Sequence, residues 1–237
     1  MEVERRKTKK YTFKSLKVEE LRKLGSLIVD QDKFCSKYRR LLYLLKTNMK
    51  EGILSTLIQF YDPLYHCFIF PDYQLLSTLE EYSSIIGLPI TGRIPFIGLE
   101  GYPKSHDIAK FTHLRKDEIE NNMVTKGGLP GVPAQFLIER ALSLSQERKE
   151  DDFEAIFSLL VYGFFLFSNI NNFADMNAIK IFMKGNLVPT LLENTYYSIY
   201  LRNSYGKGMI TCCTPLLYKW YISHLPNTND FWDLKEG

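Results

Sequence analysis

The chain has 237 residues, enough for one large domain or two small ones with a buried core. Hydrophobic residues make up 45% of it and aromatic residues 14%, which excludes an intrinsically disordered chain. The net charge of +3 is unevenly spread: residues 1–50 contain 15 Lys/Arg and 6 Asp/Glu, whereas residues 51–237 contain 15 and 21. Arguments about binding to polyanions therefore apply to the N-terminal end.

The four cysteines are Cys35, Cys67, Cys212 and Cys213, and none belongs to a Cys-x-x-Cys pair. The chain has no Asn-x-Ser/Thr glycosylation sequence, and "MEVERRKTKK" at its start is not an apolar signal segment. These features predict an intracellular protein with free, mostly buried thiols. The longest apolar run, residues 155–167, is shorter than the roughly 20 residues of a membrane span, so it predicts a buried helix and no membrane partner.

Residues 1–17 carry seven Lys/Arg and predict a flexible basic arm. Its first part could act as a nuclear import signal, as a nonspecific contact with nucleic acid, or as a plain solubilising tail. The residues concerned are Arg5, Arg6, Lys7, Lys9 and Lys10. Tyr11 and Phe13 could stack on bases, but two aromatic residues do not make a stacking platform.

Residues 18–29, 32–48 and 49–61 repeat apolar side chains at helical spacing and predict three amphipathic helices. Next, "HCFIF" and "YQLLS" stand on either side of a Pro-Asp turn and predict a small β-hairpin. His66 and Cys67 are adjacent in this hairpin. Because neighbouring side chains on a strand point to opposite faces, these two cannot form a catalytic dyad with each other.

The segment 78–86 carries clear helix start and stop signals. Thr78 and Glu81 form a Thr-x-x-Glu capping box, in which each side chain accepts a hydrogen bond from the other residue's backbone amide. Gly87 stands where a left-handed residue ends a helix, and Pro89 prevents the helix from resuming. We therefore predict a helix of about two turns whose ends are set by local chemistry.

The segment "TKGGLPGVP", residues 125–133, is the best candidate for an internal hinge between two subdomains. Helical patterns flank it on both sides. They fall at about 105–113, 115–124, 133–147, 153–167, 174–183, 189–203 and 214–225. With these helices and one or two small β-hairpins, the sequence predicts a mainly α, multi-helix globular domain over residues 18–237.

The acidic cluster of Glu150, Asp151, Asp152 and Glu154 precedes the helix predicted over 153–167. Its charge complements the positive end of that helix, so the cluster predicts a solvated helix start. General acid–base catalysis would need carboxylates from separate elements that face one pocket.

The adjacent Cys212 and Cys213 could be a redox pair or half of a zinc site, but His224 is the only other candidate ligand nearby. We therefore predict that both are small buried side chains. Trp220 shares a helical face with Leu217 and Tyr221 and is predicted to lie in the core. The Gly- and Lys-containing turns match neither the Walker pattern nor the dinucleotide-binding pattern. We therefore expect no catalytic residue, no metal and no cofactor.

The sequence segments "CFIFPDYQLL" and "TLEEYSSIIGLPITGRIP" together resemble the signature of the plant mobile domain family. The matching positions are Thr78, Leu79, Glu80, Gly87, Leu88, Pro89 and Gly92. "AIFSLLVYGFFLFSN", "TYYSIYLRN" and "GMITCCTPLLYKWYISHLP" are similar to later segments of that family, so the resemblance covers about residues 16–226 and includes Trp220. In one departure, Phe60-Tyr61-Asp62-Pro63 replaces the family's common Trp-Arg-Pro.

The resemblance implies a transposon-associated, non-catalytic interaction or scaffold domain. It implies a nuclear location, protein partners and a link to transposon silencing or chromatin. It transfers no catalytic residue, and the aminotransferase-like name of some relatives has no support here, because no lysine stands out as a Schiff-base site. Related sequences continue further, so we expect a C-terminally truncated product. Two other classes stay open, a cryptic hydrolase with a Cys-His site and a gag-like structural protein of a retroelement.

Overall fold

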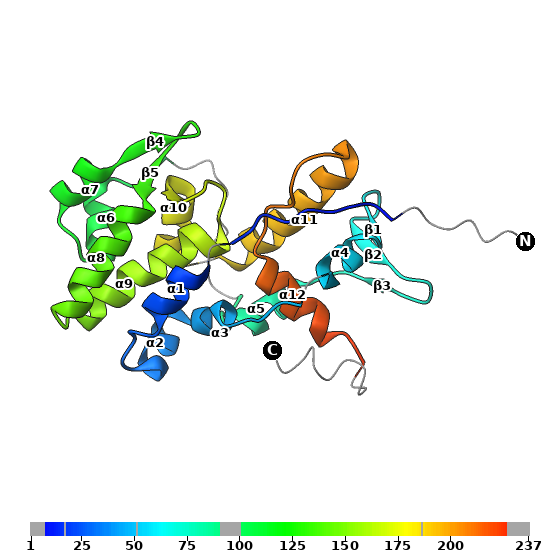
Figure 1. Cartoon of the computed structure of the whole chain (residues 1–237), viewed down its shortest axis with the longest axis horizontal. Coiled ribbons are helices and arrows are strands. Elements are labelled where there is room, and N and C mark those ends of the chain that lie inside the picture. Colours follow the sequence, from blue (N-terminus) through cyan, green and yellow to red (C-terminus); the bar gives the residue numbers. More distant parts are fainter. Residues whose placement is uncertain (1–7, 17, 51, 91–100, 186, 227–237) are drawn as a thin grey trace, which may run out of the picture.

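The computed structural model describes residues 8–16, 18–50, 52–90, 101–185 and 187–226. In this part of the chain, twelve α-helices, one π-helical turn and six short strands form a mainly α domain, as predicted (Figure 1). The described residues contain one α-helix more than the predicted segments, because the segment predicted as one helix over 32–48 is broken at Arg39. Arg39 adopts a positive φ of 65°, which ends one helix before the next begins.

The first helices and strands contribute residues to a single hydrophobic core. They are α1 (Val18–Gly25), α2 (Gln31–Tyr38), α3 (Leu41–Leu45), α4 (Ile53–Ile58), β1 (Tyr61–Asp62), β2 (Cys67–Ile69), β3 (Gln74–Leu75) and α5 (Leu79–Ile86). The predicted hairpin is present as β2–β3, and β1 adds a third antiparallel strand to it. Phe68 of this sheet is fully buried and packs its ring 5.8 Å from the ring of Trp220.

The remaining elements complete the domain. They are α6 (Ser105–Thr112), α7 (Lys116–Asn122), β4 (Val124–Lys126), β5 (Leu129–Pro133), α8 (Ala134–Gln146), α9 (Glu150–Val161), the π-helical turn η1 (Tyr162–Leu166), β6 (Phe173–Asp175), α10 (Met176–Lys184), α11 (Val188–Tyr205) and α12 (Thr214–Ser223). The long apolar run predicted as a core helix forms α9 and η1, and it is buried along nearly its whole length.

The prediction of a flexible basic arm is wrong for residues 8–16. Thr12 and Lys14 exchange backbone hydrogen bonds of 2.9 Å with Ile210, so this segment pairs with a distant part of the chain. The Tyr11 hydroxyl donates to Asn203 Oδ1 (2.7 Å), and the tyrosine ring is buried. Tyr11 and Phe13 therefore serve as packing residues, since burial of their rings offsets the cost of ordering a charged segment.

The segment 125–133, where the sequence placed a hinge, forms the hairpin β4–β5. Gly127 and Gly128 both have positive φ (61° and 80°), the backbone that a two-residue type I′ turn requires. Strand β5 also pairs with β6. The hairpin is thereby joined to a strand more than forty residues further along the chain.

Two glycines allow close packing around β6. A Cβ atom on Gly163 would lie 2.6 Å from Ala174 Cβ, and one on Gly131 would lie 2.3 Å from the Ala174 carbonyl oxygen. Neither distance is tolerated between real atoms. The sequence thus needs glycine at both positions for the π-helical turn and β5 to approach β6.

Candidate functional site

The predicted signature segment forms the helix α5 with the expected ends. Glu81 N donates to Thr78 Oγ1 (3.2 Å) and Thr78 N donates to Glu81 Oε2 (2.8 Å), so the capping box is present. Gly87 ends the helix in the left-handed conformation, with φ 77° and ψ 28°. Arg40 then holds this end of α5 from outside, because its backbone N–H donates to the Ile86 carbonyl and its guanidinium donates to the Ser84 carbonyl.

Glu81 also connects α5 to α12, which the sequence did not reveal. The indole N–H of the fully buried Trp220 donates to Glu81 Oε2 (3.0 Å), and His224 Nε2 lies 2.8 Å from Glu81 Oε1. His224 Nδ1 faces the Trp220 carbonyl at 2.9 Å. The Ser223 hydroxyl lies 3.3 Å from the same nitrogen, so the imidazole ring is held between α5 and the end of α12.

Burial alone would raise the pKa of the Glu81 carboxyl. Hydrogen bonds from Thr78 and Trp220 and the charge of His224 outweigh this effect and hold the pKa below its usual value. The Glu81 carboxylate thus has its contacts within the folded chain, with groups at the start of α5 and with residues of α12 and its end. These contacts hold the two helices together. Thr78, Glu81 and Trp220 therefore join α5 to α12 at this corner.

The thiols are poorly placed for nucleophilic catalysis. Cys67, Cys212 and Cys213 are buried, and burial raises the pKa of each thiol, that of Cys213 to about 12. A reactive cysteine needs the opposite shift and an exposed sulfur.

The histidines all lie in the described part of the chain, and each faces a partner other than sulfur. His66 Nδ1 lies 3.2 Å from the Tyr61 hydroxyl, while His106 and His113 lie 2.9 Å and 2.6 Å from Asp107 and Asp152. The described residues also contain no group of three or more metal-ligating side chains placed around a common point. Within the same residues, no helix combines the length and apolar character needed to cross a bilayer.

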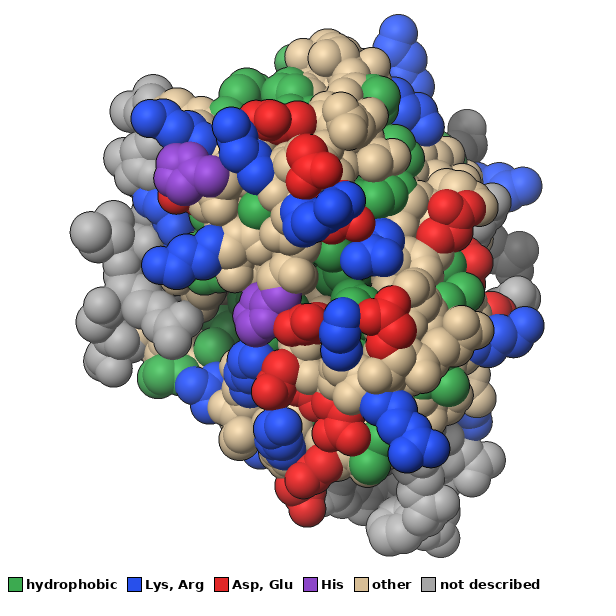
Figure 2. Space-filling model, turned by 90° about the vertical axis from the view of Figure 1, so that its left-hand side faces the viewer, with side chains coloured by type: hydrophobic (Ala, Val, Ile, Leu, Met, Phe, Trp, Pro, Cys, Tyr) green, Lys and Arg blue, Asp and Glu red, His purple; other side chains and the backbone are tan. Residues whose placement is uncertain are grey.

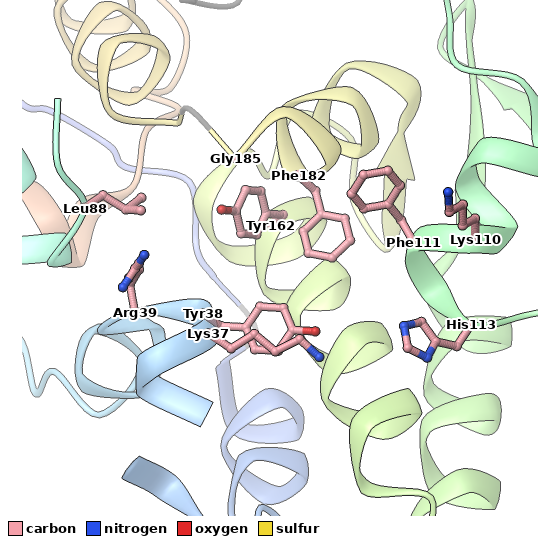
Figure 3. A pocket seen from close by; sticks show the side chains of 10 residues that line it. All are labelled: Lys37, Tyr38, Arg39, Leu88, Lys110, Phe111, His113, Tyr162, Phe182 and Gly185. Carbon is pink, nitrogen blue, oxygen red and sulfur yellow. The ribbon is translucent and has the colours of Figure 1, made fainter. Parts of the chain in front are cut away.

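A different feature stands out as a binding site, a cavity of about 320 Å³ between α2, α6, η1 and α10 (Figure 3). Four of its lining side chains can carry positive charge, namely Lys37, Arg39, Lys110 and His113. In Figure 3, the first two come from the end of α2 and the other two from α6 and its end, on the opposite side of the cavity. No carboxylate is found among the described residues that line it.

Aromatic rings form much of the remaining wall. Tyr162 and Phe182 lie between the two cationic sides in Figure 3, with ring centroids 5.1 Å apart in an edge-to-face arrangement. Tyr38 and Phe111 add two further rings. The cavity therefore combines flat apolar surfaces with positive charge at two sides.

Local backbone geometry positions the charged residues. Arg39 follows α2 with a φ of 65°, and His113 ends α6 with a φ of 56°. Residues other than glycine rarely adopt such φ values, and they are found preferentially at functional sites. Leu88, which directly follows the Gly87 turn of the signature, also lines the cavity, so the predicted helix–loop corner forms one of its walls.

Two acidic residues at the start of α9 form ion pairs, one of them with a residue that lines the cavity. Asp152 pairs with His113, and Asp151 pairs with Lys33 at 3.2 Å. The prediction of a solvated acidic cluster is wrong for Glu154, which is only 3% exposed and whose pKa is raised by burial. The cause is that α9 begins at Glu150, which turns Glu154 toward the core.

On the face turned toward the viewer in Figure 2, Lys/Arg and Asp/Glu side chains are interspersed. Surface charge of both signs therefore surrounds the helices on this side of the molecule. The described residues that line the cavity differ from this mixed surface, because four of them can carry positive charge and none is a carboxylate.

A family model described as a domain of unknown function, DUF7745, matches residues 21–237. The chain belongs to the DUF7745 family. Comparisons with curated proteins and with solved structures found no match to it. The DUF7745 match does not test the resemblance to the plant mobile domain family, which stays a prediction.

The DUF7745 match begins at residue 21, after the predicted basic residues. Arg5, Arg6 and Lys7 lie outside the described residues, as does Gly92 of the signature. The side chains of Lys9 and Lys10 are exposed, while their backbones bond to Gln59 and Arg202. These two cations are thus available for contacts, although the backbone that carries them is held against the domain.

Sequence reasoning predicted the turn at Gly87 that precedes Leu88, but it predicted neither the cavity nor its cations. The lining comes from residues 37 to 185 and depends on how α2, α6 and α10 meet. The only local signal was a pair of basic residues, Arg39 and Arg40, directly after a helix pattern.

Proposed function

We propose that this DUF7745 chain is a non-catalytic interaction domain derived from a plant transposable element, and that it acts in the nucleus. The resemblance of residues 16–226 to the plant mobile domain family motivates the origin and the nuclear location. Protein partners, with a link to transposon silencing or chromatin, are part of the same proposal. The basic residues near the N-terminus would add a contact with nucleic acid or with the import machinery.

The observation that carries the non-catalytic part is the state of the polar groups that could do chemistry. Three thiols are buried with raised pKa values, and the histidines face hydroxyl, carboxylate or carbonyl oxygens. A Cys-His hydrolase needs a thiol within hydrogen-bond reach of an imidazole at a pocket wall. The geometry therefore favours binding over bond breaking.

The location and partner are tested with a fluorescent, affinity-tagged fusion expressed in plant cells. We expect the fusion to enter the nucleus and to co-purify from nuclei with a reproducible set of chromatin or silencing proteins. Changing Arg5, Arg6, Lys7, Lys9 and Lys10 to Ala should reduce nuclear entry and the salt-dependent retention on DNA. Exclusion of the parent fusion from the nucleus would contradict the proposal. Concentration-dependent assembly into large particles, seen by light scattering, would favour a gag-like structural protein instead.

A further inference from the structure

The cavity between α2, α6, η1 and α10 has the composition of a site for one class of small ligand. We propose that it binds a nucleotide, in which the aromatic base contacts the rings and a phosphate contacts the cations. This inference deepens the proposed binding role. The cavity is separate from the basic N-terminal residues. A test of nucleotide binding is therefore independent of a test of nuclear localisation.

Arg39 and Lys110 are the cations that remain available to a phosphate. The Arg39 guanidinium donates one bond from Nη1 to the Ser36 carbonyl (3.0 Å), and its other N–H groups have no acceptor among the described residues. No described acidic side chain pairs with Lys110. By contrast, Lys37 lies over the Tyr38 ring at 5.1 Å, and His113 is already paired with Asp152. Guanidinium and ammonium groups are the usual protein partners of phosphate.

The aromatic wall fits the base. Tyr162, Phe182 and Phe111 present ring surfaces to the cavity, and Phe111 is 45% exposed, so one ring is accessible from solvent. Stacking of a base on such a ring contributes about 1–3 kcal/mol and does not depend strongly on which base it is. We therefore expect little discrimination between bases.

The size of the cavity is compatible with a single nucleotide. Its volume of about 320 Å³ lies at the lower end of the range for small-molecule pockets. The same chemistry is offered by a free mononucleotide and by one residue of a single-stranded nucleic acid. The two sources differ in whether a phosphodiester strand improves binding.

The test is isothermal titration of the full chain with AMP at 50 mM salt. Adenosine and inorganic phosphate serve as comparison ligands, and a short single-stranded oligodeoxyadenylate serves as the strand. We expect AMP to bind more tightly than adenosine or phosphate alone, with affinity that falls as salt is raised. Tighter binding of the oligonucleotide than of AMP would identify the strand as the source, and equal or weaker binding would identify the free nucleotide.

Three variants link binding to the cavity. Lys110→Ala should raise the Kd for AMP about ten-fold, which corresponds to the loss of one charge-assisted contact. Phe111→Leu should weaken adenosine and AMP alike by about five-fold or more, because it removes an exposed stacking ring without emptying the core. Lys207→Ala makes the same charge change at an exposed residue outside the cavity and should leave both Kd values unchanged. Circular dichroism melts of all three variants establish that they are folded.

The proposal is overturned if neither AMP nor the oligonucleotide binds at millimolar concentration. It is also overturned if adenosine binds as tightly as AMP, or if folded Lys110→Ala and Phe111→Leu retain the parent affinity. Nuclear entry and co-purification of the fusion are separate measurements. Any of these results would therefore overturn nucleotide binding without contradicting the interaction-domain proposal.

Discussion

Replacing Glu81 by alanine removes the one acceptor that the buried Trp220 indole uses. It also removes the capping contact to Thr78 and the contact to His224. An unpaired buried donor costs about 1–3 kcal/mol, and the partly exposed contact to His224 adds at most about 1 kcal/mol. We therefore expect Glu81→Ala to lower the free energy of unfolding by about 3 kcal/mol. For a domain of this size, that loss lowers Tm by about 6–12 °C.

Differential scanning calorimetry checks this value against a matched control. Glu80→Ala removes the same charge from an exposed position in the same helical turn and should shift the free energy of unfolding by less than about 0.5 kcal/mol. Trp220→Phe keeps a buried aromatic ring, although a smaller one, and removes the indole donor. In a double-mutant cycle with Glu81→Ala, which removes the acceptor, it should show a coupling of about 1 kcal/mol. Equal effects of Glu81→Ala and Glu80→Ala, or a coupling near zero, would refute the structural role of this network.

The same network gives a pH dependence of known sign. The pKa of Glu81 is lowered in the folded protein, so its ionised form stabilises the fold above the unfolded pKa. This contribution is lost as pH falls from the ordinary carboxyl value toward the lowered one. The stability difference between the parent and Glu81→Gln should accordingly shrink between about pH 6 and pH 3. A difference that stays constant over this range would show that the Glu81 charge does not contribute.

Three further changes test other parts of the structure. Gly163→Ala should cost about 1–3 kcal/mol in urea denaturation, since the new methyl group would overlap β6, whereas Gly101→Ala, with no described atom within 4 Å, should be neutral. Asp175→Ala should cost about 1–2 kcal/mol in the same assay, because the carboxylate accepts two backbone N–H groups at the start of α10. Changing Lys9 and Lys10 together to Ala should reduce nuclear entry of the fusion and leave Tm within about 2 °C, because backbone atoms make the docking bonds. A large loss of stability in this last variant would mean that the lysine side chains act in folding.

Local chemistry was predictable wherever its partners lie close in sequence. The capping box from Thr78 to Glu81, the Gly87 exit and the buried run over 155–167 all follow from spacings of a few residues. A Gly-Gly pair between two short apolar segments is also typical of a β-hairpin. Gly127-Gly128 therefore predicts the β4–β5 hairpin that is observed, although residues 125–133 were interpreted as a hinge. In each case the physical cause is local: a side-chain cap, a glycine conformation or a continuous apolar run that can be read from neighbouring residues.

Contacts between distant segments were not predictable in this way. Trp220 and His224 meet Glu81 across about 140 residues, and Arg39 and Lys110 face the same cavity from different helices. The basic composition of residues 8–16 indicated a solvated arm. In the structure, backbone hydrogen bonds to Ile210 hold this segment against the domain. Composition reports the average solvation of a segment and carries no information on which distant strand or helix will pair with it.

The proposed function requires that this DUF7745 chain does not use its thiols for catalysis. The most direct measurement is the rate of iodoacetamide alkylation of each cysteine in the native protein, followed by mass spectrometry from pH 6 to pH 10. We predict that Cys67, Cys212 and Cys213 react far more slowly than a free cysteine and become reactive only when the protein unfolds. A native thiol that reacts faster than free cysteine, with a rate that rises through a pKa below about 8.5, would contradict the account.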